Sequence, residues 1–297
     1  MTFAQRRTYW SYRAAGALIQ RLPPGVSLQL ARAAGNLAGR LSPRRRALVT
    51  RHQARVYAKR DLALPCDAAS KAFASYARYW MEAFRLPSVS LDEIAGTMTA
   101  DGVDHLRASQ AAGKGTILAL PHVGNWDWGG AWLTQEFPLT VLVERLEPPE
   151  LFEWFTQFRK SIGMRVIPYG ADAGPVLLRA LRANETVCLV CDRDLEASGI
   201  EVEFFGERTT FPAGPATLAL RTGAALLATV VYFENDGGHR GIITEPLEVR
   251  RSGESLRVDI ARTTQALAVR FEELIAREPE QWHLFQPNWP SDRTEVL

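Results

Sequence analysis

The stretch GTILALPHVGNWDWGGAWL, residues 115–133, contains the two patterns that decide the fold of this chain. Its first part, 115–121, is a short apolar run of the kind that forms a strand buried in a sheet. Its second part begins at Asn125, a residue type that is preferred at the start of a helix. The stretch therefore predicts a strand, a turn and a helix, which is the first half of a parallel βαβ unit.

The same alternation continues along the chain. Apolar or alternating runs predict further strands at 139–144, 165–170, 186–191, 201–206 and 224–233, with a last candidate near 241–249. Helices are expected at 125–136, 149–162, 174–184 and 214–222, followed by a long helix at 255–278. Strands that alternate with helices indicate parallel crossovers. We therefore predict an α/β fold with a mostly parallel central sheet flanked by helices.

Residues 1–95 have helical periodicity instead. In the segment 71–87, aromatic and small apolar residues recur at three- and four-residue steps, and the pattern ends at Pro87. We expect an N-terminal helical cap over residues 1–95 and an α/β core over residues 96–297, which together form one compact unit.

Charge is distributed unevenly along the chain. The net charge is +2, yet residues 1–60 hold thirteen of the 35 Lys and Arg residues and none of the 33 Asp and Glu residues. Arg13 and Arg21 are interleaved with Trp10 and Leu18 at roughly helical spacing, a pattern typical of a helix that lies on a membrane interface. We expect this basic region to associate with anionic phospholipid, and an ordinary solvated surface is the alternative interpretation.

The apolar segment at 14–19 is far shorter than the roughly 20 residues that a bilayer span needs, and Pro23 and Pro24 end its helix. Arginines interrupt this segment and no small-residue cleavage site follows it, so a signal peptide is not expected. The sequence predicts a peripheral protein at the cytoplasmic face of the plasma membrane. Nucleic-acid binding is not expected, because no nucleic-acid-binding motif accompanies the charge.

His122 directly follows the strand at 115–121, and ligands of parallel sheets bind just outside the carboxyl ends of the strands. Asp127 lies five residues further on, in the first turn of the next helix, where its carboxylate is expected to reach and orient the imidazole. An imidazole held in this way is suited to act as a general base. A core histidine with satisfied hydrogen bonds is the alternative, and the spacing by itself does not decide between them.

Longer blocks of sequence resemble a known family. HVGNWD, residues 122–127, is similar to the His-x-x-x-x-Asp motif of glycerolipid and lipid A acyltransferases, and residues 192–226 resemble the second conserved block of the lauroyl or myristoyl (late) acyltransferase family. Further blocks resemble the branch of this family that acylates phosphatidylinositol mannosides, and they lie at 75–87, 118–133, 158–168 and 282–290. The matches cover most of residues 70–290.

The resemblance implies a glycerolipid-acyltransferase-like sandwich that transfers a long acyl chain, palmitoyl, from acyl-CoA to a mannose hydroxyl of a phosphatidylinositol mannoside. In this reaction His122 is the general base and Asp127 is its partner. We expect no metal and no cofactor, with acyl-CoA as a co-substrate. The alternatives are a lipid A type enzyme that uses acyl carrier protein and a catalytically silent acyl-CoA or lipid-binding protein.

Polar side chains near the ends of other strands complete the expected site. Arg193 follows the strand at 186–191 and is suited to bind a phosphate or a developing oxyanion. Glu201 is the candidate for a second catalytic carboxylate near the imidazole, with Glu196 as the alternative. Substrate contacts are expected from Asn125, Trp126, Glu144, Arg159, Asp192, Arg193 and Asp194.

The remaining reactive side chains are expected to be structural. Cys188 and Cys191 lie in the apolar run at 186–191, which predicts buried thiols without the further ligands that zinc needs. No Gly-x-Ser-x-Gly motif is present, so we expect no covalent acyl-enzyme. The stretch at 211–214 lacks the Glu of the Phe-Pro-Glu-Gly motif of the wider glycerolipid enzymes, which argues against a glycerol-phosphate acceptor. Structural or surface positions are expected for His52, His105, His239 and His283.

Overall fold

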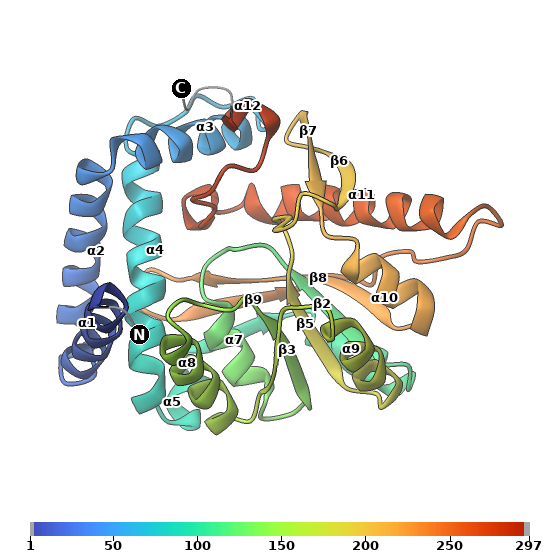
Figure 1. Cartoon of the computed structure of the whole chain (residues 1–297), viewed down its shortest axis with the longest axis horizontal. Helices are drawn as coiled ribbons and strands as arrows, with labels where there is room; N and C mark the ends of the chain where they lie inside the picture. The colour runs from blue at the N-terminus through green and yellow to red at the C-terminus, as the bar shows by residue number, and fades with distance from the viewer. Residues whose placement is uncertain (1–2, 294–297) are drawn as a thin grey trace.

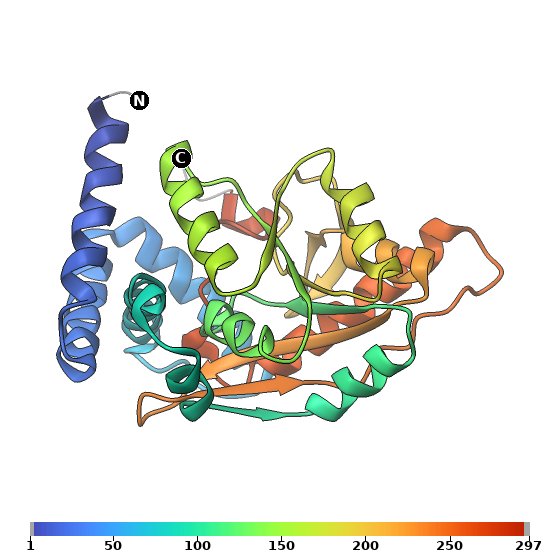
Figure 2. The ribbon, with the colours of Figure 1, turned by 90° about the horizontal axis from the view of Figure 1, so that it is seen from below.

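A computed structural model describes residues 3–293 and centres on a seven-stranded sheet (Figures 1 and 2). The strand order is β1-β9-β8-β2-β5-β3-β4. The bounds are β1 Met98–Asp101, β2 Thr116–Leu120, β3 Leu139–Val143, β4 Arg165–Pro168, β5 Thr186–Val190, β8 Ala225–Phe233 and β9 His239–Ile243. Neighbouring strands are parallel except for β8 and β9. The predicted α/β fold with a mostly parallel sheet is confirmed.

Helices cover both faces of this sheet. One face carries α5 Leu91–Gly96, α6 Val103–Ala111, α7 Trp126–Leu133 and α8 Pro149–Ser161, and the other carries α9 Ala173–Arg182, α10 Gly214–Thr222 and α11 Leu256–Ile275. Every residue of β2 is buried: Leu118 packs with the α7 side, whereas Ile117 packs with the α9–α11 side. A strand covered on both faces has a continuous apolar sequence, which explains the run at 115–121.

The N-terminal helices α1 Phe3–Ile19, α2 Pro24–Leu41, α3 Pro43–Lys59 and α4 Ala68–Arg85 stand together at one side of the sheet (Figure 1). α2 packs against α4 through a row of small residues, which are Ser27, Ala31, Gly35 and Gly39. At Gly35 an added Cβ would lie 2.5 Å from the backbone oxygen of Phe73, so only glycine permits this approach. No helix among residues 3–293 is both long enough and apolar enough to cross a bilayer.

The C-terminal segment returns to this helical layer after α11, through η2 Pro279–Gln281 and α12 Pro290–Arg293. The His52 side chain in α3 bonds to Asp292, and the backbone N–H of Gly124 donates to the carbonyl oxygen of Gln281 at 3.0 Å. The segment at 279–293 therefore joins the helical layer to the loop that follows β2.

The structure differs from the sequence prediction around residues 201–206. This segment is β6 Ile200–Phe204, so the predicted strand is confirmed, but it pairs with β7 Glu207–Phe211 as an antiparallel hairpin outside the central sheet and does not take part in the parallel alternation. Phe205 and Gly206 both have positive φ angles, as in a tight hairpin turn. The sequence prediction also missed β1, α6 and β7, and it extended the last strand beyond its actual end at Ile243.

Candidate active site

His122 lies at the carboxyl edge of the sheet, where its imidazole meets the carboxylate of Asp192. The Nδ1 atom is 2.5 Å from Oδ1 of Asp192, and the backbone N–H of His122 donates to Oδ2 at 3.0 Å. The strands β2 and β5 that precede these two residues are parallel neighbours, which brings their carboxyl ends together. Asp192 is fully buried, whereas a quarter of the His122 side chain is exposed.

Asp192 stays charged in this buried position. Burial alone would raise the pKa of this carboxyl, but His122 and the hydrogen bond that Trp282 Nε1 donates at 2.8 Å outweigh it and lower the pKa. A carboxylate bonded to Nδ1 favours the tautomer with its proton on that nitrogen. The second nitrogen, Nε2, has no hydrogen-bond partner among residues 3–293 and is left to accept a proton.

Asp127 does not contact the imidazole, contrary to the prediction from its spacing. Its carboxylate accepts two hydrogen bonds from Arg159, at 2.7 and 2.9 Å, and one from the Tyr79 hydroxyl at 3.0 Å. The loop before α7 is fixed to β8, since the backbone N–H of Asn125 donates to the carbonyl oxygen of Val231 at 2.9 Å. The first turn of α7 therefore directs Asp127 towards α8 and α4, and Asp192 takes the expected place beside the imidazole.

The buried pair of Asp127 and Arg159 lines the site without exposing a free charge. Burial alone would lower the pKa of Arg159, but the adjacent Asp127 carboxylate outweighs it and raises the pKa, so the guanidinium is charged. Its Nε and Nη2 atoms both donate to the Asp127 carboxylate. Arg159, which was expected to contact substrate, lines the cavity with its guanidinium already paired to Asp127.

Glu201 lies away from the imidazole, so it is not the second carboxylate of the site. Its side chain is 66% exposed on β6 and pairs with Arg208 of the same hairpin at 3.2 Å. Glu201 was predicted near the imidazole, but side chains alternate between the two faces of β6 and that of Glu201 points to solvent. Glu196 lines the cavity, but the carboxylate bonded to His122 is Asp192.

Of the other residues that were expected to contact substrate, some line the cavity and one does not. Asn125 is fully buried, its side chain accepts from the Trp128 N–H and donates to Glu82, and it is not among the described residues that line the cavity. Trp126 lines the cavity, with its ring centroid 5.5 Å from that of His122. Asp194 lines it as well, while its carboxylate accepts backbone N–H groups of the loop after β5.

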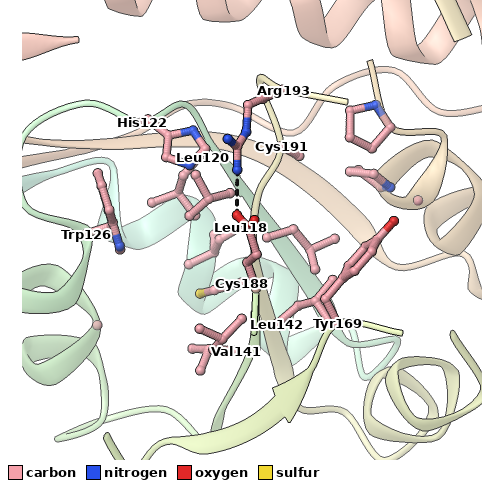
Figure 3. Close-up of a pocket in the computed structure, with 18 of the residues that line it drawn as sticks. Leu118, Leu120, His122, Trp126, Val141, Leu142, Tyr169, Cys188, Cys191 and Arg193 are labelled. Atoms are coloured by element: carbon pink, nitrogen blue, oxygen red, sulfur yellow. Dashed lines mark hydrogen bonds and ion pairs between the residues drawn. The ribbon is translucent and has the colours of Figure 1, made fainter. Parts of the chain in front are cut away.

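A cavity of about 610 Å³ opens beside His122. Pairing between β3 and β5 stops at Val141 and Cys188, although both strands continue, and residues beyond that point line the cavity. Figure 3 shows His122 and Arg193 at one side of this space, above Leu118 and Cys188. An apolar space between separating strand ends, with few polar groups at its mouth, is typical of a ligand site.

Arg193 and Glu144 form an ion pair across this mouth, with Nη2 2.5 Å from Oε2 (Figure 3). Both were expected to contact substrate, and both line the cavity. Nε of Arg193 is buried and has no hydrogen-bond partner within the part of the chain that the structure describes. This arginine therefore retains a donor for a ligand with negative charge.

Cys188 and Cys191 are free thiols that line the cavity. Burial raises the pKa of Cys188 to about 12 and holds the pKa of Cys191 well above its usual range. Both thiols are therefore protonated at neutral pH, which removes the nucleophilic form. Within residues 3–293, no three His, Cys, Asp or Glu side chains gather as metal ligands do.

Two residues that support the site were missed. Trp282 donates to Asp192, and the backbone N–H of His283 donates to the carbonyl oxygen of His122 at 2.7 Å. Both belong to the block at 282–290, in which no role was predicted for Trp282 and only a structural or surface position was predicted for His283. His239 and His52 are buried and bond to the carboxylates of Glu82 and Asp292, in line with the structural positions that were expected.

Known proteins resemble this chain over almost its whole length. Residues 2–291 match the family described as bacterial lipid A biosynthesis acyltransferase. The phosphatidylinositol mannoside acyltransferase of Mycolicibacterium smegmatis is 40% identical over 288 residues, which cover 96% of this chain and 92% of the relative. The protein of the same name from Mycobacterium tuberculosis is 40% identical over 295 residues, which cover 97% and 90%. This chain is an acyltransferase that belongs to the bacterial lipid A biosynthesis acyltransferase family.

Proposed function

We propose that this acyltransferase moves a long acyl chain, palmitoyl, from acyl-CoA to a mannose hydroxyl of a phosphatidylinositol mannoside, with His122 as the general base. The observation that carries the proposal is the pair of His122 and Asp192 at the mouth of an apolar cavity. The acceptor is proposed from the names of the two mycobacterial relatives.

The reaction needs two proton transfers, one from the acceptor hydroxyl to His122 and one from His122 to the leaving thiolate. Nε2 of His122 takes the proton of the acceptor hydroxyl as its oxygen attacks the thioester carbonyl, and Asp192 stabilises the imidazolium that forms. The tetrahedral intermediate then releases the CoA thiolate, which receives the proton from the imidazolium. The carbon–sulfur bond is replaced by an ester bond, and free CoA leaves.

The cavity supports a long acyl donor. Its walls include Leu118, Leu120, Val141, Leu142, Val190 and Val231. Each methylene group that leaves water for such a wall contributes about 0.8 kcal/mol, so a long chain gains much more than a short one. Arg193, with its unpartnered buried Nε, is placed to bind negative charge of the donor or of the intermediate.

The exposed face of α2 supports docking on an anionic membrane. Small residues of this helix face α4, and four of its large apolar residues face outward, which are Val26, Leu30, Leu37 and Leu41, with exposures of 45% to 73%. An apolar row of this kind on the surface marks an interaction site. Because residues 1–60 contain no acidic side chain, a lipid surface of negative charge suits it, and we place the protein at the cytoplasmic face of the plasma membrane.

Sedimentation with vesicles tests this docking. The double substitution Leu30→Ser and Leu37→Ser removes apolar surface without touching the core, so binding to vesicles that contain phosphatidylglycerol is expected to fall at least tenfold. Val269→Ser removes an apolar residue of α11 that is 45% exposed, compared with 53% for Leu30 and 55% for Leu37, and is the control. Equal sedimentation of the double variant and the control would contradict the membrane face.

The acyl transfer itself is tested by mass spectrometry of the products. Purified wild type and His122→Ala are incubated with palmitoyl-CoA and, in parallel, with a phosphatidylinositol mannoside or a lipid A precursor. We expect one palmitoyl group on the mannoside, and none with the variant. Acylation of the lipid A precursor alone would mean that this lipid, and not the mannoside, is the acceptor. Release of CoA without acylated lipid would mean that His122 activates water or another alcohol. Binding of palmitoyl-CoA without turnover of any kind would favour a silent binding protein.

A further inference from the structure

Glu82 is a buried carboxylate in α4, outside the site described above. It accepts hydrogen bonds from Arg78 Nε at 2.7 Å, Asn125 Nδ2 at 2.6 Å and His239 Nε2 at 2.8 Å. Burial alone would raise the pKa of Glu82, but His239 and Arg78 outweigh it and lower the pKa, so the carboxylate is charged. Hydrogen bonds to a buried charge are stronger than neutral ones.

One of these partners belongs to the loop that carries His122. Asn125 is fully buried, and its Oδ1 accepts from the Trp128 N–H at 3.0 Å, which caps the start of α7. Its Nδ2 donates to Glu82, and this contact fixes which way the amide is turned. The short segment between His122 and α7 is therefore held at its far end by Glu82.

Glu82 is itself fixed from a second direction. The Arg78 guanidinium donates to the carbonyl oxygen of Glu234 at 3.0 Å and lies 4.3 Å from the ring centroid of Phe233. These groups belong to the end of β8 and the turn before β9. The α4 helix is thus anchored to the sheet at the point where Glu82 reaches the loop.

We propose that Glu82 is a positioning residue for acyl transfer, because its carboxylate holds Asn125 and through it the loop that places His122. The inference rests on the proposed function, in which His122 is the base. Among residues 3–293, Glu82 is not one of those that line the cavity, so it has no contact with the acyl chain. Its loss acts on the position of the base and leaves donor binding in place.

The effect of this positioning is large for a group that does not touch substrate. A displacement of about 1 Å at the reacting atoms lowers the rate roughly 100-fold. We expect Glu82→Gln to lower kcat about 100-fold, with the KM for palmitoyl-CoA nearly unchanged. Glutamine keeps the volume of the side chain but cannot accept from Arg78, Asn125 and His239 together.

Glu272→Gln is the matched control. Glu272 is equally buried, in α11, and bonds to the backbone N–H of Phe205 and to Lys59, away from the His122 loop. Both variants are expected to lose thermal stability, whereas only Glu82→Gln loses kcat. Equal kcat values for the two folded variants would reduce Glu82 to a structural role and overturn the inference.

A second variant covers the case in which Glu82→Gln does not fold. Asn125→Ser keeps a hydroxyl that caps α7 but is too short to reach Glu82, so the same loss of kcat is expected. Where both single variants fold, Glu82→Gln should cause no further loss in the Asn125→Ser background. Unchanged turnover in Asn125→Ser would overturn the inference.

His122→Ala in the same assay separates the two proposals. An inactive His122→Ala beside a fully active Glu82→Gln would refute the positioning role alone and leave the proposed base intact. Retained turnover in His122→Ala would refute the base, and with it the positioning role that acts through it.

Discussion

Two histidines of this chain are each held by a buried aspartate, but only one of them faces a cavity. Nδ1 of His122 lies 2.5 Å from Asp192, and Nε2 of His52 lies 2.9 Å from Asp292. The other ring nitrogen of His52 bonds to the carbonyl oxygen of Leu284 at 3.0 Å, and its side chain is 1% exposed. His122 is 25% exposed and keeps one ring nitrogen for a ligand. Both carboxylates orient a histidine, but only His122 has the open nitrogen beside a cavity that its proposed role as a base requires.

Removal of the two imidazoles gives the largest expected contrast. His122→Ala should lower kcat at least 1000-fold. A positioned general base contributes roughly 10²–10⁴-fold, and without the imidazole Asp192 has no imidazolium to stabilise. His52→Gln should lower Tm and lower kcat far less than His122→Ala, because it loosens the C-terminal segment but leaves the bond between His122 and Asp192 in place. Steady-state kinetics of both variants measure kcat, and thermal melts measure Tm. A loss of turnover in folded His52→Gln as large as that in His122→Ala would mean that the two histidines do not differ in role.

Exchange of the two aspartates for asparagine gives the next effect. Asp192→Asn should lower kcat about 100-fold, because it removes the charge that stabilises the imidazolium. Asp292→Asn should lower kcat far less than Asp192→Asn but destabilise the fold by roughly 3 kcal/mol, since the buried Asp292 carboxylate also pairs with Arg55 at 3.2 Å. Turnover at saturating palmitoyl-CoA and denaturant melts separate the two. If Asp192→Asn lost stability alone, its pair would be structural like that of His52.

The position of His122 could be predicted from the sequence, but its partner could not. The strand and helix of residues 115–133 are local patterns, so they place His122 at the sheet edge without knowledge of the other strands. Asp192 lies next to it only because β2 and β5 are neighbours, and strand order depends on long-range packing. Asp127 was near in sequence, yet hydrogen bonds from Arg159 and Tyr79 direct it elsewhere.

The residues that hold the site in place could not be predicted either, because their contacts also depend on long-range packing. Tyr79 matched the helical core pattern of residues 71–87, and its hydroxyl bond to Asp127 depends on where α4 docks. Trp282 follows a long helix with no strand or motif spacing to connect it to Asp192. The hairpin of β6 and β7 was recognisable only through its turn at Phe205 and Gly206, whereas alternation alone resembles that of a sheet strand.

A third histidine, His283, is buried and affects the pH dependence of stability. Burial, with a smaller effect of His122, lowers the pKa of His283 to about 3, so this imidazole is neutral in the folded protein. The unfolded chain binds a proton at this residue below about pH 6.5, and the folded protein does not until about pH 3. The free energy of unfolding should therefore fall as pH decreases within this window, by up to about 1.4 kcal/mol per pH unit.

His283→Gln should flatten that decrease. Melting curves between pH 7 and pH 5 are suited to the test, because most carboxylates titrate at lower pH. In this range the Tm of the wild type should fall by a few degrees more than the Tm of His283→Gln. A parallel decrease in both proteins would assign the pH dependence to other groups and contradict a neutral, buried His283.

The smallest effect is expected at Cys188, and it tests whether His122 activates the acceptor or a thiol. A base beside two cavity thiols is also the arrangement of a cysteine nucleophile, which would carry the acyl chain as a thioester. Burial raises the pKa of Cys188 to about 12, so the thiolate is unfavourable, and Cys188→Ala should leave kcat almost unchanged. Intact-protein mass spectrometry after incubation with palmitoyl-CoA alone provides the second readout. A mass increase of one acyl group that is absent from Cys188→Ala would show a covalent intermediate, and the open nitrogen of His122 would then serve the thiol instead of the lipid hydroxyl.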